Sequence, residues 1–408
     1  MNIIINNKVS PLLLLVFVLS FSFIIPTSIY NYYTFLLDSY LLFQRISMVV
    51  MAFYVLYNVL KKCNVFFNMK FIILYWTYVI LVTFFNEISV FSLIESVLNK
   101  IIVLSFISIV IFKDKKSSVH GMWLAFSLLI IINIVISLLF PKGLYIDDAN
   151  GLCWFFGSKN EITNYLVIHS ILSIGMIDLF VPEKIRFKYI IYSNVFIIFN
   201  SLISQSSTCL VVGIVMIAGE LIYLFKYRES FHLFSLNPKF MILIFLVINI
   251  LIVFFNFQAA FSSAFESLFN KDMTLTGRVS VWNLAMKQVQ EHMVFGLGYE
   301  GPAIIRSKIG FSNCHNTLIS CLYYGGILGA ALFFMYIYSV ADHISKNNTW
   351  VKLPFTFILI GIMLIFITES RDFQLSTVLA LNLLIIISST GAKKNAIYKV
   401  NCKKTNTR

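Results

Sequence analysis

Charged residues are scarce in this chain. Of its 408 residues only 12% are Asp, Glu, Lys or Arg, whereas 59% are hydrophobic and the mean hydropathy is +0.87. That leaves too little polar surface to cover a soluble globule of this size. The apolar runs are about 17 to 25 residues long, enough to cross the hydrocarbon core as helices and too long for barrel strands. The sequence therefore predicts an all-α integral membrane protein.

Several sequence signals of common enzyme classes are also missing. The chain has no Walker loop, no dinucleotide fingerprint and no His-Glu-x-x-His helix. Its six cysteines lack metal-ligand spacing. Asp147-Asp148 is the one aspartate pair expected outside, and adjacent carboxylates in a polar loop are more often solvated than metal-bound. We therefore expect no metal site and no cofactor. Without internal repeats or Gly/Ser linkers, residues 1–408 are expected to form a single domain.

The apolar runs between polar breaks predict a polytopic bundle of about twelve transmembrane helices. The approximate centres of these spans lie in 11–29, 41–60, 71–85, 92–112, 122–140, 162–181, 189–204, 208–225, 240–257, 317–340, 353–368 and 374–390. The pair around the turn Ser204-Gln205-Ser206-Ser207 is the weakest, because the turn is so short. If that pair is one re-entrant hairpin, the count falls to ten.

The basic residues predict the orientation of the bundle. With the N-terminus inside, 21 of the 31 Lys and Arg residues fall on the inner side. Both termini are then cytoplasmic, and the long polar loop 258–316 between spans nine and ten is extracytoplasmic. This asymmetry accounts for most of the net charge of +13, so no nucleic-acid partner is needed. The basic tail 393–408 is interpreted as an anchor at anionic membrane lipids.

Three arginines are expected on the outer side. Arg278 and Arg306 lie in the long loop, and Arg371 lies in the short loop after span eleven. Each guanidinium presents a planar fork of donors that matches phosphate oxygens, so together they could form a cationic cup. The alternative is that they are ordinary interface arginines paired with nearby carboxylates, namely Glu300, Glu369 or Asp372.

His315 is the candidate for proton transfer. A neutral imidazole can accept a proton from a sugar hydroxyl near neutral pH. The neighbouring Asn316 could orient a substrate or cap the helix expected to begin at Thr317. A position at the membrane interface would keep both side chains within reach of a lipid-linked substrate.

The order of these residues resembles the signature of the O-antigen polymerase and O-antigen ligase superfamily. The residues concerned are Thr276-Gly277-Arg278, Trp282, Gly296-Leu297-Gly298, His315-Asn316 and Tyr324-Gly325-Gly326-Ile327-Leu328-Gly329. The similarity covers about residues 270–330, with weaker similarity at 157–160 and 204–208. Two positions depart from the family pattern, Ser207 in place of an arginine and Met293 in place of a proline. Because the resemblance implies that ligases depend more on that arginine, Ser207 favours a polymerase.

The resemblance implies an inverting, metal-independent glycosyltransferase of the cytoplasmic (inner) membrane that acts in surface polysaccharide and lipopolysaccharide biosynthesis. Its donor and acceptor would be oligosaccharide repeat units linked to undecaprenyl pyrophosphate, with a chain-length regulator as a further partner. On this interpretation Arg278, Arg306 and Arg371 stabilise the leaving pyrophosphate and His315 activates the acceptor hydroxyl. Lys159 would guide the anionic headgroup, and Asn316 would orient the substrate.

Two alternatives remain open at this point. An O-antigen ligase would use the same donor but transfer the glycan to lipopolysaccharide core. A flippase for lipid-linked sugars, from a different class, would be expected to carry charges deep in both halves of the bundle. Here the spans hold few charges, with Glu95 and Glu220 as the main exceptions.

The predicted topology can be tested with reporter fusions. Fusions at Lys115, Phe234 and Lys394 should report a cytoplasmic location, because these residues lie in the basic segments predicted on the inner side. A fusion at Ser307 should report the outer side. A cytoplasmic signal at Ser307 would place the arginine-rich loop on the wrong side for an outward-facing site.

Overall fold

A computed structural model of the chain describes residues 10–24, 26–61, 69–147, 151–229, 236–255, 278–347 and 350–389. Every one of the twelve predicted ranges contains a helix. These are α1 (Pro11–Phe23), α3 (Leu37–Leu60), α4 (Lys70–Phe85), α5 (Phe91–Lys113), α6 (Lys115–Leu139), α7 (Ile162–Phe180), α8 (Arg186–Ile203), α9 (Ser207–Glu229), α10 (Pro238–Phe255), α14 (Thr317–Lys346), α15 (Lys352–Thr368) and α16 (Leu375–Ser389). The described residues also form the shorter α-helices α2 (Thr27–Asn31), α12 (Arg278–Glu291) and α13 (Pro302–Ile309).

Within the described part of the chain, five helical segments are long and apolar enough to cross a membrane, as expected of a helical membrane protein. They are α5, α6, α7, α14 and the segment Thr34–Leu60, which joins a 3-10 turn to α3. Shorter apolar helices are found in α1, α4, α9, α10, α15 and α16, and α8 falls in neither group. The helices therefore lie where the sequence places them, whereas the count of twelve spans stays a prediction.

The chain divides into two compact units, each built from separate stretches of sequence. Unit 1 contains Met1–Phe67, Asn99–Leu224 and Lys393–Arg408, and unit 2 contains Asn68–Leu98 and Phe225–Ala392. In unit 1, α6 packs against α1, α7 and α8. A small antiparallel sheet, β1 (Tyr145–Asp147), β2 (Gly151–Trp154) and β3 (Gly157–Ser158), lies between α6 and α7 in the sequence.

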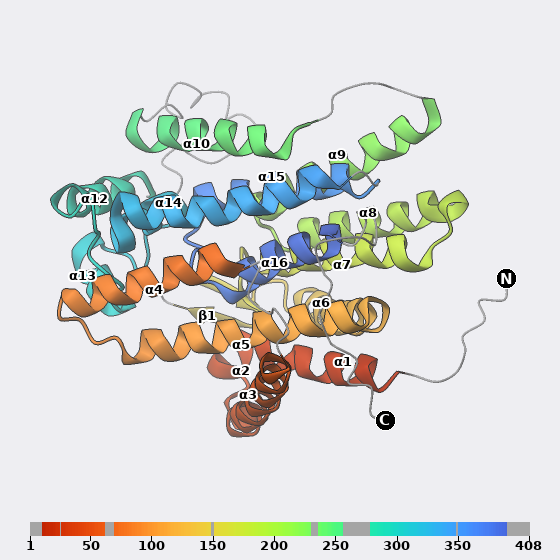
Figure 1. Ribbon diagram of the computed structural model, residues 1–408, viewed down its shortest axis with the longest axis horizontal. Helices are drawn as coiled ribbons and strands as arrows, with labels where there is room; N and C mark the ends of the chain where they lie inside the picture. Colours follow the sequence, from red (N-terminus) through yellow and green to blue (C-terminus); the bar gives the residue numbers. More distant parts are fainter. Residues whose placement is uncertain are drawn as a thin grey trace, which may run out of the picture. The chain divides into compact units, whose positions relative to one another are not determined.

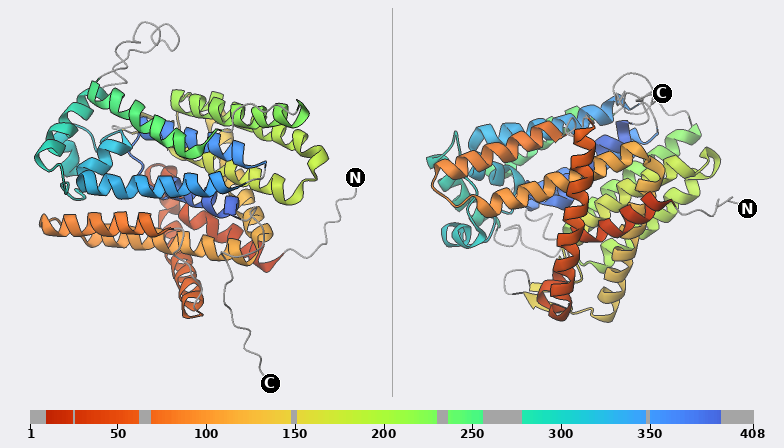
Figure 2. Two further views of the ribbon diagram at one scale, coloured as in Figure 1. Left: turned by 45° about the horizontal axis from the view of Figure 1, so that its top comes forward. Right: turned by 60° about the horizontal axis from the view of Figure 1, so that its bottom comes forward.

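Helix α14 is the centre of unit 2. It contacts α4, α10, α12, α15 and α16, and Figures 1 and 2 show it running alongside α4. The helix is broken at Gly326, where φ is 57° and ψ is −160°. A break inside an apolar helix frees backbone groups that lipid cannot satisfy, so another segment has to supply hydrogen bonds.

The segment after α12 supplies those bonds. Tyr323 O and Tyr324 O accept hydrogen bonds from Leu297 N (2.8 Å) and Gly298 N (3.0 Å). In the other direction, Ile327 N donates to the carbonyl oxygen of Met293 at 2.9 Å. In an unbroken helix, Tyr323 O would accept from Ile327 N. The crossing segment 293–298 therefore replaces the helical hydrogen bonds that the break removes.

Glycine permits this close crossing. A Cβ atom at Gly326 would lie 2.3 Å from Val294 O, and one at Gly296 would lie 2.5 Å from Gly325 N. Both glycines also have positive φ, which side chains rarely adopt. The two glycine motifs of the sequence thus meet each other, and Gly326 has a structural role at their crossing.

Replacing Gly326 with alanine should destabilise unit 2. The new Cβ would clash with the Val294 carbonyl and the backbone would be strained, so we expect a loss of about 2 kcal/mol or more. Thermal unfolding of the purified protein in detergent measures this effect. Gly301→Ala is the matched control, because no atom lies within 4 Å of a Cβ there. Equal unfolding midpoints for the two variants would contradict the crossing.

Candidate functional site

The site begins at the first residue of α12. Arg278 opens this helix and Trp282 lies one turn later, so the two side chains share a face. Trp282 is buried, and its indole Nε1 donates a 3.4 Å hydrogen bond to the carbonyl oxygen of His315. This spacing directs Arg278 toward the start of α14. Thr276 and Gly277, which complete the motif, lie outside the described residues.

The carboxylate of Glu369 is the centre of the site. Its Oε1 lies 3.0 Å from Arg278 Nη2, and its Oε2 lies 3.8 Å from Arg371 Nη2. Nδ1 of His315 lies 3.7 Å from the same Oε2. Three of the residues expected to act together are therefore gathered around one glutamate. Two arginines facing one carboxylate leave this side of the site with an excess positive charge.

The segment 369–372 is fastened to the first turn of α14. Thr317 Oγ1 donates to Glu369 O at 2.7 Å and accepts from Arg371 N at 3.0 Å. The carboxylate of Asp372 accepts hydrogen bonds from Ser320 Oγ (2.8 Å) and from Tyr75 Oη of α4 (2.6 Å). The Asp372 side chain thus serves as an anchor, while Glu369 faces the arginines and His315.

His315 has an unusual backbone conformation for a non-glycine residue, with φ at +48°. Its N–H donates to Asn313 Oδ1 at 2.9 Å, and its carbonyl accepts from Trp282. Residues held in such conformations often lie at functional sites. Nδ1 is buried although 21% of the side chain is exposed, so the exposure belongs to other atoms of the residue. A reactant could reach the ring on a side that does not face Glu369.

Glu369 remains ionised in this environment. Burial acts to raise its pKa, but contact with His315 and the positive charges of Arg371 and Arg278 lower the pKa to about 2. A charged carboxylate next to two guanidiniums and an imidazole is thus the stable state of the site over the physiological range. The remaining donors of Arg278 are suited to an anionic ligand.

Asn316 takes the capping role that the sequence left open. Its Oδ1 accepts from Ile319 N at 3.1 Å, which caps α14. Its Nδ2 donates to Asn249 Oδ1 and to Ile367 O, and the residue is fully buried. Its expected contact with substrate stays a prediction, whereas its part in fixing the start of α14 is visible.

Arg306 is not brought to Glu369. Arg306 is exposed on α13, and its guanidinium forms no ion pair with any of the described residues. Lys159 is exposed after β3 in unit 1, and its expected role in guiding the headgroup stays a prediction. Next to it, Asn160 Oδ1 accepts from Ser206 Oγ at 2.8 Å, which joins the two weaker motifs of the sequence. The cup of three arginines therefore reduces to two around Glu369.

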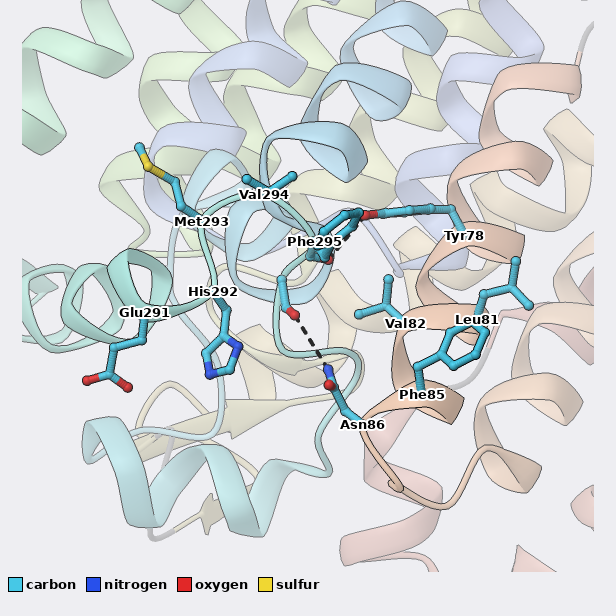
Figure 3. A pocket seen from close by; sticks show the side chains of 11 residues that line it. Tyr78, Leu81, Val82, Phe85, Asn86, Glu291, His292, Met293, Val294 and Phe295 are labelled. Carbon is cyan, nitrogen blue, oxygen red and sulfur yellow. Dashed lines mark hydrogen bonds between the residues drawn. The ribbon is translucent and has the colours of Figure 1, made fainter.

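Unit 2 also contains a cavity of about 670 Å³ beside the crossing segment. Figure 3 shows its walls, formed by α4 residues such as Phe85 and by the chain from Glu291 to Gly296. Asn86 Nδ2 donates to Gly296 O at 3.4 Å and Tyr78 Oη donates to Phe295 O at 3.3 Å, which ties α4 to this segment. The lining is mainly apolar, with His292 among its polar groups.

Sequence reasoning treated Glu369 only as a possible partner for the arginines and missed its central position. Pairing of Arg278 and Arg371 with Glu369 is the alternative that the sequence had left open, and the structure shows it. A signal was available, since Glu369-Ser370-Arg371-Asp372 concentrates three charged residues between two apolar runs. Such charges next to membrane-buried helices commonly mark functional sites.

Acid should weaken the contribution of Glu369 to stability. Its pKa of about 2 in the fold lies below the ordinary 4.5, so the carboxylate stabilises the protein above about pH 4.5 and this contribution disappears as pH falls toward 2. The full effect is about 3 kcal/mol. Thermal unfolding of wild type and Glu369→Gln should therefore converge over this range, with exposed Glu183→Gln as the control. A constant gap between the two curves would contradict the assignment.

Comparison with known families gives a match in the middle of the chain. Residues 192–334 match the sequence model of a family described as O-antigen ligase. No curated protein matches the chain. The matched range contains Arg278, Trp282 and His315, whereas Glu369 and Arg371 lie beyond it. The match supports the O-antigen polymerase and ligase superfamily, whose members are membrane enzymes of the glycosyltransferase kind, and it does not separate polymerase from ligase.

Proposed function

We propose that the protein is a surface-polysaccharide polymerase of the cytoplasmic membrane. It joins oligosaccharide repeat units carried on undecaprenyl pyrophosphate, and its site faces the outer side of that membrane. The observation that carries this proposal is the cluster around Glu369, in which a histidine lies beside two arginines. Such a cluster combines a proton acceptor with a cationic site for a leaving anion.

The leaving group explains the need for positive charge. When the bond between the sugar C1 atom and the pyrophosphate oxygen breaks, negative charge develops on that oxygen. Arg278 and Arg371 can stabilise this charge through charge-assisted hydrogen bonds. Helices α12 and α14 begin close by, at Arg278 and Thr317, so their N-terminal amides add to the positive potential.

The acceptor hydroxyl attacks C1 from the face opposite the pyrophosphate, so the configuration at C1 inverts. The new bond joins the acceptor oxygen to C1, and lipid pyrophosphate leaves with the bonding electrons. The hydroxyl proton passes to the imidazole of His315. This transfer reaction requires no external reductant, oxidant or nucleotide. Arg306 and Lys159 remain candidates for guiding the headgroup into the site.

A ligase is the second candidate, because the matched family is described as O-antigen ligase. Ser207 at the start of α9 favours the polymerase, because the resemblance implies that ligases depend more on an arginine at this position. Deletion of the gene distinguishes the two functions. Loss of a polymerase should leave single repeat units on the surface acceptor, because ligation continues. A bare acceptor with long polymer accumulating on the lipid carrier would instead identify a ligase.

Substitution of Arg278 and His315 should impair different steps. Arg278→Lys keeps the charge but loses the planar fork, so both donor affinity and turnover should fall. His315→Ala removes the proton acceptor, so turnover should fall about 10²- to 10⁴-fold with donor binding retained. The assay is polymer formation by purified protein in membranes supplied with defined lipid-linked repeats, with and without chelator, which should have little effect.

Two variants control for general damage. Arg186→Lys alters an ion-paired arginine of unit 1, and His343→Ala alters a histidine near the C-terminal end of α14. Both should retain turnover. If His315→Ala turns over at the wild-type rate, His315 is not the proton acceptor and the proposed reaction loses its base.

A further inference from the structure

We propose that Glu369 is a positioning residue for His315, and that its carboxylate keeps the imidazole proton on Nδ1 and the lone pair on Nε2. The catalytic consequence of this assignment depends on the proposed function. The choice of tautomer does not, because it follows from the geometry of the two side chains alone.

The first observation is the surroundings of Nδ1. This atom is buried, and among the described residues it has no hydrogen-bond partner, while the carboxylate oxygen Oε2 of Glu369 lies 3.7 Å away. A neutral imidazole carries one N–H group and one lone pair. An N–H directed at a carboxylate is attracted, whereas a lone pair in that position is repelled. The tautomer with its proton on Nδ1 is therefore favoured, and a small closing movement would complete a hydrogen bond.

The second observation is that both partners are held in place. Hydrogen bonds with Asn313 and Trp282 fix the backbone of His315. The Phe311 ring packs edge-on against the imidazole, with the two ring centroids 5.5 Å apart. Glu369 is fixed through its main chain by Thr317 and through Oε1 by Arg278. The imidazole is therefore already oriented before the acceptor sugar binds.

The third observation concerns the charges around the ring. Among the described residues, the charged side chain that lies against Nδ1 of His315 is Glu369, and Arg278 from α12 and Arg371 from the segment after α15 lie against the same carboxylate. The carboxylate of Asp372, the other acid of this segment, is occupied by Tyr75 and Ser320. Glu369 is thus the acid positioned to select the tautomer and to stabilise the imidazolium that forms when His315 accepts a proton.

Glu369→Gln tests the assignment with little change in shape. The amide oxygen can still accept from Arg278, but the amide N–H₂ group would face Nδ1. An N–H donor there favours a lone pair on Nδ1 and moves the proton to Nε2, which leaves no acceptor for the hydroxyl proton. Glu369→Asp keeps the carboxylate and should preserve the wild-type tautomer.

The tautomer is measured by ¹⁵N NMR of protein labelled at histidine, at a pH where titration shows neutral imidazole. The His315 signals are assigned by their loss in His315→Ala. We expect a protonated Nδ1 in wild type and Glu369→Asp, and a protonated Nε2 in Glu369→Gln. Glu300→Gln is the matched control, because Glu300 is a buried carboxylate of the same unit that binds Lys308 and Tyr323 instead. An Nε2-protonated wild type, or an unchanged tautomer in Glu369→Gln, overturns the assignment.

Turnover then separates this inference from the proposed function. With the tautomer switched, kcat of Glu369→Gln should fall about 10²- to 10⁴-fold and recover in part in Glu369→Asp, while donor KM changes much less. If the tautomer switches and kcat is unchanged, Glu369 still positions His315, but the role of His315 as the base in the proposed reaction is wrong.

Discussion

One carboxylate compensates the buried charge on which the candidate site depends. Arg371 is almost entirely buried and Arg278 is 15% exposed, and placing a guanidinium in such surroundings without an anion costs several kcal/mol. Glu369 faces both arginines and also His315. Its attraction to these three side chains holds together the loop after α15, the start of α12 and the residue before α14. Arg278 can still offer donors to an incoming anion, because a guanidinium has five N–H donors and its bond to Glu369 uses one of them.

The rigidity of the site comes from α14. Thr317 and Ser320 in its first turn hold Glu369, Arg371 and Asp372, and Asn316 caps the same turn. About two turns further on, α14 breaks at Gly326 and pairs with the segment that follows α12. Helix α12 is therefore attached to α14 near both of its ends, by Trp282 and by the crossing segment. Arg278 is therefore presented from a helix that is held near both of its ends.

Local pattern was enough to predict the helices. Long apolar runs specify helices in a membrane protein because the backbone has no other partner there, and each of the twelve predicted ranges contains one. The four-residue spacing of Arg278 and Trp282 and the choice of glycine at 296 and 326 were also visible in the sequence. His169 in α7 is buried and forms hydrogen bonds with Ser127 and Ser173, as a polar side chain inside an apolar helix requires.

The central role of Glu369 could not be predicted, because it depends on contacts distant in sequence. Arg278 and Glu369 are 91 positions apart in the sequence. No local sequence pattern predicts that the loop after α15 lies against the start of α12. The sequence also groups Arg306 with Arg278, because both lie in the same predicted loop, whereas Arg306 is exposed on α13. Proximity along the chain and proximity in the fold agree within a helix turn but not across a bundle.

The most direct test is the structure of the protein in a lipid membrane with a non-transferable analogue of the pyrophosphate-linked donor. The pyrophosphate oxygens should lie within hydrogen-bond distance of Arg278 and Arg371, with the sugar C1 atom on the side of His315. Glu369 should keep its contact with the imidazole when the ligand is bound. A donor pyrophosphate seated elsewhere, with the Glu369 cluster unoccupied and unchanged, would show that this cluster is a structural ion pair and not the site of transfer.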